Sequence, residues 1–281
     1  MTLWELFGTL VDILRGRRRY KESMRQIRTA GQHMEVIQAV IAAYRQGDYE
    51  AALQAVAPLR DAKDVSLATS YSFYRGTMLM NLGRLEEAEQ SFRRNLAIAQ
   101  DEKRRALAYS SLGRLLLEMQ RYEEAAECFQ ASLREWPGRG APHRGLAEVC
   151  LRQRREFSEA ARWAALAVDE ERSRMSPSDS AEVRNTYNIN LAENLATLAW
   201  AVASESGNRA EVDRIVEEAV SLSSRGDTVT SAAMVHYQSA QAYLAIGEAG
   251  ESGKHFSEAA RIDPKGISGR AARAMTTGAE V

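Results

Sequence analysis

The sequence predicts an all-α protein built from a repeated unit, and three observations support this prediction. Of 281 residues, 45% are hydrophobic, 27% are charged and only 5 are proline, a composition that suits a mostly helical chain. Residues 84–88 match residues 121–125 in type, position by position. A small residue recurs at intervals of 36, 37 and 35 residues, at Ala52, Ala88, Ala125 and Ala160. A period of this length indicates helix pairs stacked in one dimension, so the chain length requires no second domain.

The clearest copy of the unit spans residues 106–137. Its characteristic positions are Tyr109, Leu112, Gly113, Leu116, Ala125, Phe129, Trp136 and Pro137. This pattern resembles the tetratricopeptide repeat, in which an aromatic residue, a Leu-Gly pair and a second aromatic residue precede Ala-x3-Phe and a final Pro over about 34 residues. Leu116 departs from the pattern at the second aromatic position. The resemblance implies antiparallel helices that approach closely at Gly113 and Ala125, in a right-handed superhelical solenoid of about six such hairpins.

The expected hairpins follow one another along most of the chain. The second, third and sixth are clear copies, and the other three are degenerate. The period breaks once, because 52 residues separate Ala160 from Val212, about 18 more than one family period. We expect an insertion there, since Pro177 disfavours helix at the residue before it. The predicted segments are 1–32 for an N-terminal helix, 33–168 for repeats one to four, 169–186 for the insertion, 187–264 for repeats five and six with a helix starting near 181, and 265–281 for a short C-terminal tail.

The first 32 residues predict an amphipathic, basic helix. Apolar residues recur at helical spacing, and a run of arginines follows where cations suit the end of a helix. Three interpretations stay open: the helix packs on the first repeat or in the groove of the array, it binds a partner or a second copy of the chain, or it lies on an anionic membrane. The residues that would carry the docking or membrane role are Trp4, Phe7, Leu10, Leu14, Arg17, Arg18 and Arg19.

No motif in the sequence predicts catalysis or a bound cofactor. A phosphate-binding loop, a nucleophile elbow and a metalloprotease motif are all absent from it. We therefore expect no enzymatic activity, no cofactor and no metal. The histidines and cysteines lack partners at metal-ligand spacing, so packing or surface roles are expected for His33, His143, His236, His255, Cys128 and Cys150.

Overall charge and hydropathy narrow the partners and the compartment. The formal net charge of -1 provides no electrostatic case for a nucleic-acid partner. Without a disulfide framework, a secretory signal or an apolar run of ~18 residues, the cytoplasm is the expected compartment, with peripheral attachment to a membrane as an alternative. Self-association is a further alternative, because the C-terminal tail is a thin cover for the last repeat.

The resemblance also implies a concave groove lined by the first helix of every pair. The two ends of the mapped groove are apolar and aromatic, and its middle is charged, with arginine in excess. Aromatic residues, methionine and arginine are enriched at binding surfaces. Some of these side chains could instead pack on a neighbouring helix. The predicted partner-binding residues are Ile37, Ile41, Tyr44, Arg45, Phe73, Met80, Asn81, Arg114, Leu117, Arg144, Arg152, Asn194, Trp200, Tyr237 and Gln241.

We therefore predict a non-catalytic adaptor that binds a peptide or helix of a partner protein in its groove. Some family members hold chaperone carboxylates with Lys, Asn and Arg, but the corresponding places here are Ile37, Ile41 and Leu107, so that clamp is absent. One alternative is an assembly factor anchored on a membrane by its N-terminal helix. Another is a peptide-sensing regulatory protein, because bacterial pheromone sensors of the family contact peptide backbones through asparagines, and this chain carries Asn185, Asn188, Asn190 and Asn194.

Overall fold

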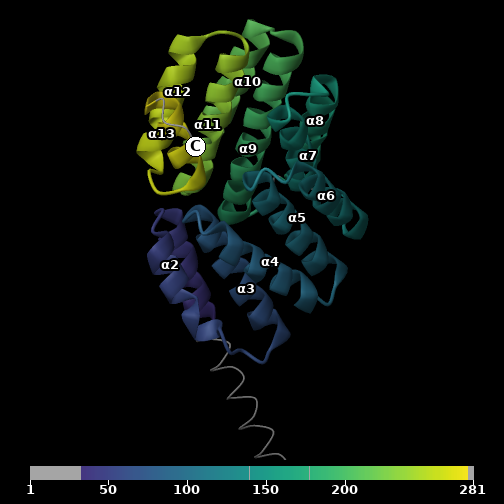
Figure 1. Ribbon diagram of the computed structural model, residues 1–281, viewed down its shortest axis with the longest axis vertical. Helices are drawn as coiled ribbons and strands as arrows, with labels where there is room; N and C mark the ends of the chain where they lie inside the picture. The colour runs from purple at the N-terminus through teal and green to yellow at the C-terminus, as the bar shows by residue number, and fades with distance from the viewer. Residues whose placement is uncertain (1–32, 139, 177, 278–281) are drawn as a thin grey trace, which may run out of the picture.

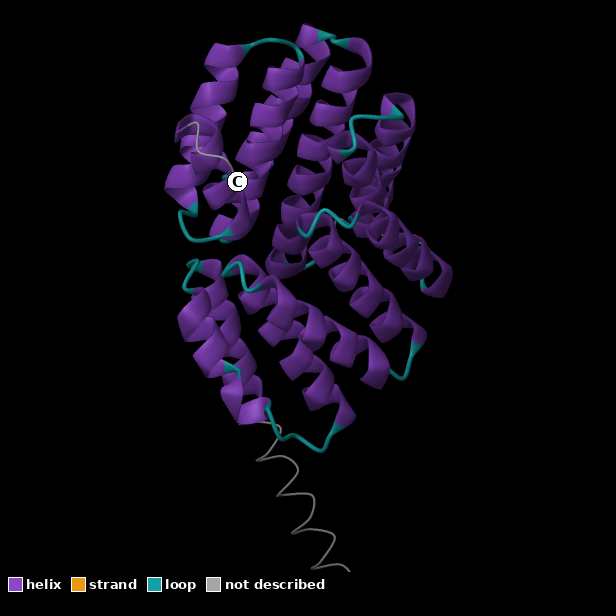
Figure 2. Ribbon diagram, viewed as in Figure 1, coloured by secondary structure: helices purple, strands orange, loops and turns teal. Residues whose placement is uncertain are grey.

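The computed structural model describes residues 33–138, 140–176 and 178–277, and throughout these ranges the chain forms helices joined by short turns (Figures 1 and 2). No strand occurs within these ranges. The predicted N-terminal helix, with its docking residues Trp4 to Arg19, lies outside the described residues. The expectation of an all-α solenoid of stacked hairpins is confirmed.

Six helical hairpins follow one another, and a final helix covers the last of them. Within each hairpin the first helix faces the inside of the curved array. The first hairpin pairs the helix containing residues 33–45 with α2 (Tyr49–Ala55), which leads into the 3₁₀ helix η1 (Ala57–Leu59). The others are α3 (Val65–Asn81) with α4 (Leu85–Ile98), α5 (Glu102–Glu118) with α6 (Tyr122–Glu135), α7 (Gly140–Arg152) with α8 (Phe157–Arg174), α9 (Ala181–Ser206) with α10 (Arg209–Ser223), and α11 (Val229–Ala245) with α12 (Ala249–Ile262), followed by α13 (Ile267–Thr277).

Glycine and phenylalanine set the close approach of the helices, as the repeat pattern predicts. A Cβ atom added to Gly113 would lie 2.9 Å from the ring of Phe129, and one added to Gly145 would lie 2.4 Å from the same ring. Phe129 thus fills the space between α5 and α7. Gly76 and Phe92 repeat the arrangement one unit earlier, at 2.7 Å. The helices can pack at this distance only because these glycines have no side chain.

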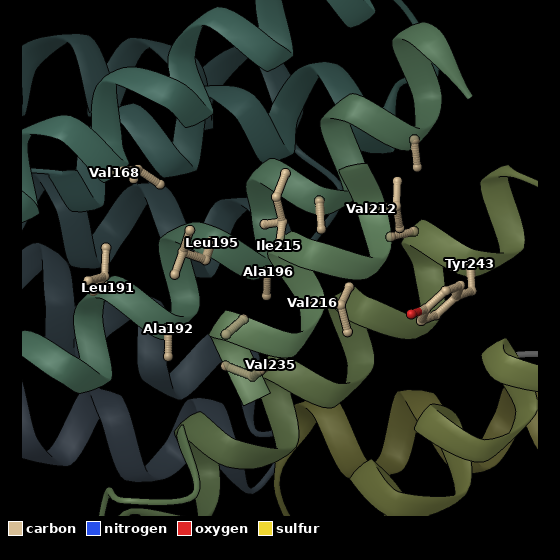
Figure 3. Close-up of a cluster of buried hydrophobic side chains, with 14 residues drawn as sticks. Val168, Leu191, Ala192, Leu195, Ala196, Val212, Ile215, Val216, Val235 and Tyr243 are labelled. Carbon is tan, nitrogen blue, oxygen red and sulfur yellow. The ribbon is translucent and has the colours of Figure 1, made fainter. Parts of the chain in front are cut away.

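Small and branched residues fill the core between α9, α10 and α11 (Figure 3). Leu195 of α9, Ile215 of α10 and Val235 of α11 are all buried there. Alanines take many of the remaining positions on α9, including Ala192, Ala196 and Ala199. The small side chains let this long helix lie between its neighbours on two sides.

The extra residues near position 180 do not form the expected insertion. α8 continues to Arg174 and α9 starts at Ala181, so only a short connection separates two long helices. Ser180 caps α9 by accepting a hydrogen bond from the backbone N–H of Val183 at 3.3 Å. The prediction of a helix starting near 181 agrees with this start. The polar end of α8 is helical because Arg174 pairs with Glu171 at 3.3 Å and stacks over the ring of Tyr187 in α9.

The first and last repeats meet, which the sequence pattern did not indicate. Tyr49 of α2 donates a hydrogen bond to the carboxylate of Asp263, and its hydroxyl lies 2.8 Å from that of Thr230 in α11. Arg45 and Asp227 form an ion pair at 2.9 Å beside this cluster. We call these five residues the seam. In Figure 1, α2 lies below α13 and faces the C-terminal end of the array.

Helix α13 strengthens this closure. Arg270 donates to the backbone carbonyl of Asn81, at the end of α3. Ile267 packs against the apolar cluster that contains Leu79 and Leu116. Ala272 is fully buried against the sixth repeat. The short tail expected at 265–281 therefore includes the covering helix that a terminal repeat needs, and this helix also contacts the second repeat.

Gly145→Ala should destabilise the fold, because its methyl group would displace the ring of Phe129. Overpacking of this kind costs about 1–3 kcal/mol. Gly253→Ala is the matched control: it also lies inside a helix, but nothing approaches its Cβ position within 4 Å. There the change should stabilise by about 0.5–1 kcal/mol through helix propensity. Urea unfolding measures the free energy of unfolding of both variants. Equal changes in the two would contradict the close packing of Gly145 against Phe129.

Tyr49→Phe should weaken the seam. It leaves the buried carboxylate of Asp263 with the backbone N–H of Gly266, at 2.9 Å, as its remaining hydrogen-bond donor. An unmet buried charge-assisted bond costs about 1–3 kcal/mol. Tyr243→Phe serves as the control, since Tyr243 also donates to a carboxylate, Asp213 at 2.9 Å, but that group is partly exposed and pairs with Arg209. A loss of unfolding free energy no larger for Tyr49→Phe than for Tyr243→Phe would contradict the role of the seam.

Candidate functional site

The curved array surrounds a partly open cavity of about 500 Å³. Its wall takes side chains from the first helix of every repeat and from α13. The seam and the contacts of α13 join the two ends of the array beside it. The volume lies within the range of roughly 300–1,000 Å³ that is typical of ligand sites.

Most of the predicted groove residues lie in this wall. The seam explains why they converge, since it brings the first and sixth repeats to opposite sides of one cavity. Aromatic and methionine side chains come mainly from the first, second, fifth and sixth repeats. The predicted residues that line the cavity are Tyr44, Phe73, Met80, Asn81, Arg114, Arg152, Trp200, Tyr237 and Gln241.

The other predicted groove residues do not line the cavity. Ile37 and Ile41 are half-buried on the first helix, and Arg45 belongs to the seam. Leu117 is 2% exposed and packs in the apolar core of the second to fourth repeats. The side chain of Asn194 is also 2% exposed. Arg144 pairs with Glu193 behind the wall, where both are largely buried.

Sequence reasoning missed the contribution of the C-terminal tail. Ile267, Ser268, Ala271 and Met275 of α13 all line the cavity. No local signal could have assigned them, because their place in the wall depends on contacts with residues nearly 190 positions earlier, such as Asn81. The spacing of apolar residues in the tail predicts a helix, but it does not predict which residues that helix contacts.

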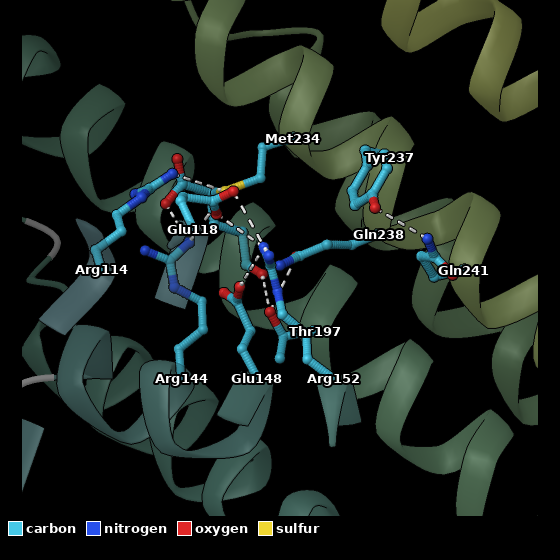
Figure 4. Close-up of polar contacts among 11 residues, drawn as sticks. Arg114, Glu118, Arg144, Glu148, Arg152, Thr197, Met234, Tyr237, Gln238 and Gln241 are labelled. Atoms are coloured by element: carbon cyan, nitrogen blue, oxygen red, sulfur yellow. Dashed lines mark hydrogen bonds and ion pairs between the residues drawn. The ribbon is translucent and has the colours of Figure 1, made fainter. Parts of the chain in front are cut away.

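Charged side chains form a network on the wall (Figure 4). Arg152 of α7 donates to Glu118 of α5 at 2.8 Å and lies 3.7 Å from Glu148. Burial lowers the pKa of the Arg152 guanidinium, but the carboxylates of Glu118 and Glu148 outweigh this effect and raise the pKa overall. Arg152 is therefore held in its charged form and in a fixed position.

Arg114 differs from the other arginines of this network. Its guanidinium donates to the sulfur of Met234 at 3.0 Å. Among the described residues, no carboxylate lies within ion-pair distance of it. Burial lowers the pKa of Arg114, but Glu193 and Glu148 act from further away and raise it overall. Arg114 is thus charged, enclosed and partly exposed to the cavity.

Amide groups complete the wall. Gln241 donates to the hydroxyl of Tyr237 at 3.1 Å, and Gln238 accepts from Thr197 at 2.9 Å. Burial raises the pKa of Tyr237, so its hydroxyl stays neutral and keeps its proton. Asn81 donates to the carbonyl of Thr77 at 3.0 Å. Amide groups of this kind can both donate to and accept from a peptide group.

The asparagine run of α9 is used within the protein. Asn185 donates to Asp227 at 3.2 Å, Asn190 donates to Glu171 at 3.1 Å, and Asn194 donates to the carbonyl of Ala167 at 2.9 Å. These bonds fasten the long α9 to α8 and to the connection before α11. Three of the four asparagines that motivated the peptide-sensor alternative therefore form bonds within the protein.

The histidines and cysteines show no arrangement for a metal. Among the described residues, no group of three or more His, Cys, Asp and Glu side chains could hold one. Cys128 and Cys150 are free thiols, and burial raises the pKa of Cys128 to about 11. His236 of α11 and His255 of α12 lie with their Nδ1 atoms 2.9 Å apart, and neither lines the cavity.

The nested hairpins and the enclosed concave wall place this protein in the class of helical-repeat solenoids. Two family models described as tetratricopeptide repeat match residues 66–134 and 111–179. Residues 66–179 therefore consist of tetratricopeptide repeats.

Solved structures of similar fold agree with this class. NprR, in complex with its cognate peptide NprX, is 13% identical with a TM-score of 0.60, and the match covers 98% of this chain and 82% of that one. The APC/C hetero-tetramer Cut9-Hcn1 is 15% identical with a TM-score of 0.52, covering 89% of this chain and 46% of that one. At these identities the likeness shows the fold alone. No curated protein matches the chain. None of the described helices is long and apolar enough to cross a membrane.

The histidine pair should make stability depend on pH. Burial and the neighbouring His236 lower the pKa of His255 from 6.5 to about 4, against the opposing effect of Glu251 and Glu258. Between these two values the unfolded chain binds more protons than the folded one. Stability should therefore be complete above pH 6.5 and fall, by on the order of 2 kcal/mol, as the pH drops toward 4.

The measurement is urea unfolding across this pH range for the wild type and for His255→Gln. Other groups also titrate there, so the difference between the two proteins is the quantity of interest. The variant should lose less stability as the pH falls. Identical pH slopes for the two proteins would contradict the assignment.

Proposed function

We propose that this protein is a non-catalytic scaffold that binds a short, extended peptide segment of a partner protein in its enclosed cavity. The observation that carries the proposal is the convergence of aromatic, methionine and amide side chains from separate repeats on one wall. Tyr44, Phe73 and Trp200 supply flat apolar surface, and Gln238 and Gln241 supply amides. Apolar walls with a few placed polar groups are typical of ligand sites.

The amides of the wall favour an extended segment over a helix, because the peptide groups of a helix already bond to one another. An extended strand of a few residues fits, and its peptide groups can pair with the amides of the wall. For this reason we propose a peptide segment, and not a helix, as the ligand.

A solved structure of similar fold also bears on the ligand. NprR, which shares the fold, was solved with a bound peptide. That likeness makes a peptide ligand reasonable, but the cavity of this chain is the main support. Two alternatives stay predictions. A membrane-attached assembly factor depends on the N-terminal 32 residues, and self-association depends on those residues or on surfaces whose partner is not known.

A steric block tests the proposal. Ser111 lines the cavity, and Ser111→Trp would fill part of it. Peptides selected from a random display library on the wild-type protein should bind this variant at least roughly tenfold more weakly, because the volume they occupy is taken. The control is Ser257→Trp, at an exposed position of α12 outside the cavity lining, which should bind as the wild type does.

Calorimetry measures the affinities, and thermal melting confirms that both variants fold. The proposal fails if the Ser111→Trp variant binds the selected peptides as tightly as the wild type. It also fails if the wild-type protein selects no peptide.

A further inference from the structure

We propose that the junction between the first and last repeats is a latch, which opens and closes in the folded protein, and that a ligand in the cavity holds it closed. The junction comprises the seam and the contact of Arg270 with the backbone carbonyl of Asn81. The coupling to a ligand rests on the proposed function, whereas the opening itself follows from the contacts between the two ends of the array.

The junction differs in its chemistry from the interfaces between consecutive repeats. Consecutive repeats share apolar clusters, such as the one that joins Phe92 of α4 to Leu146 of α7. At the junction the side chains of Tyr49 and Arg45 form hydrogen bonds and an ion pair instead. Ile267 adds an apolar contact there, but this side chain is only partly buried. The hydrophobic contribution to closure is therefore small, because it scales with the apolar area that is buried.

The packing across the junction is also sparse. Each helix packs extensively against its neighbours along the chain, but among the described helices none of α2 to α6 does so against α11, α12 or α13. The contacts that cross the junction lie at helix ends. Asp263 follows α12, Asp227 precedes α11, and Arg270 contacts the last residue of α3. Small polar interfaces of this kind permit relative motion of the parts that they join.

Opening the latch exposes groups that water can satisfy. The carboxylate of Asp263, which is 2% exposed, accepts hydrogen bonds from Tyr49 and from the backbone N–H of Gly266. Hydration of this carboxylate in the open form offsets part of the bonding that is lost. The side chains of Arg45 and Asp227 are already 41% and 47% exposed, so their separation changes little. We expect a closed form in equilibrium with a minor open form, populated at roughly 0.1–10%.

The wall of the cavity takes side chains from both sides of the junction. Tyr44 and Phe73 belong to the first two repeats, whereas Tyr237, Gln241 and Ser268 belong to the sixth repeat and α13. A ligand that contacts both sides gains all of these contacts only while the latch is closed. Such a ligand shifts the equilibrium toward the closed form by its difference in affinity for the two forms.

Pulsed electron paramagnetic resonance on the whole chain measures the opening. Spin labels are attached at Glu50→Cys of α2 and Ser257→Cys of α12, two exposed positions on opposite sides of the junction, with Cys128 and Cys150 replaced by alanine. In this background Tyr49→Phe should raise the ratio of open to closed molecules roughly 10- to 100-fold, the range expected for loss of a hydrogen bond to a charged group. A second, longer distance between the labels should appear.

Controls assign this distance to the latch. A label pair at Ser221→Cys of α10 and Ser257→Cys, both in the last two repeats, should keep one distance in every variant. Tyr243→Phe removes a similar tyrosine–carboxylate bond away from the junction and should leave both label pairs unchanged. Arg270→Gln removes the second contact of the junction and should also populate the longer distance. It decides the question if the Tyr49→Phe protein does not fold, as judged by melting.

A peptide selected on the wild-type protein tests the coupling. It should bind the Tyr49→Phe protein roughly two- to tenfold more weakly, because only the closed fraction binds it fully, although Tyr49 does not line the cavity. It should also remove the longer label distance from that protein. Tyr243→Phe should bind the peptide as the wild type does, since Tyr243 neither lines the cavity nor crosses the junction.

Three results would overturn these expectations, and they differ from one another. Label distances that stay unchanged in both the Tyr49→Phe and the Arg270→Gln proteins overturn the latch. A bound peptide that leaves the open population of the Tyr49→Phe protein unchanged overturns the coupling and leaves the proposed function standing. If no peptide is selected, the proposed function fails, and the label distances of the ligand-free protein still decide whether the latch opens.

Discussion

The buried contact between Tyr49 and Asp263 is the interaction on which the shape of the candidate site depends. It joins the second helix of the first repeat to the end of the sixth repeat, across 214 positions of sequence. Without such a contact, a stack of helix pairs presents an open groove to solvent. With it, the same side chains surround a partly enclosed cavity, in which hydrogen bonds and charges act with less screening by water than on an open surface.

The enclosure sets strict requirements on the polar residues inside it. Arg144 and Arg152 are compensated by carboxylates from neighbouring helices, and Gln238 and Gln241 bond to side chains nearby. Such networks help to specify one arrangement of the helices when every member has a partner. Arg114 has no carboxylate partner among the described residues, and its hydrogen bond goes to the sulfur of Met234.

Local sequence pattern was sufficient for the hairpins and for much of the site. Gly113, Gly145 and Phe129 nest as the repeat pattern requires, and residues such as Phe73 and Trp200 face inward because helical spacing fixes the face on which they lie. The pattern was insufficient where polar residues pair with one another. The composition at the end of α8 is rich in charged and polar residues and predicted a loop. The segment is helical because Glu171 pairs with Arg174 and accepts a hydrogen bond from Asn190. The asparagines suggested a binding surface, but their amides hold helices together.

The sequence by itself determined the class of fold, the period of the repeat and the side of each helix that faces inward, because these depend on residues within one or two turns of each other. Only the tertiary structure decided that the ends meet, that α13 completes the wall, and that Arg114 has no carboxylate beside it while Arg152 has two. Curvature is the physical reason. A small rotation at each repeat adds up along the array, so whether Tyr49 reaches Asp263 depends on all the interfaces together and is encoded in none of them alone.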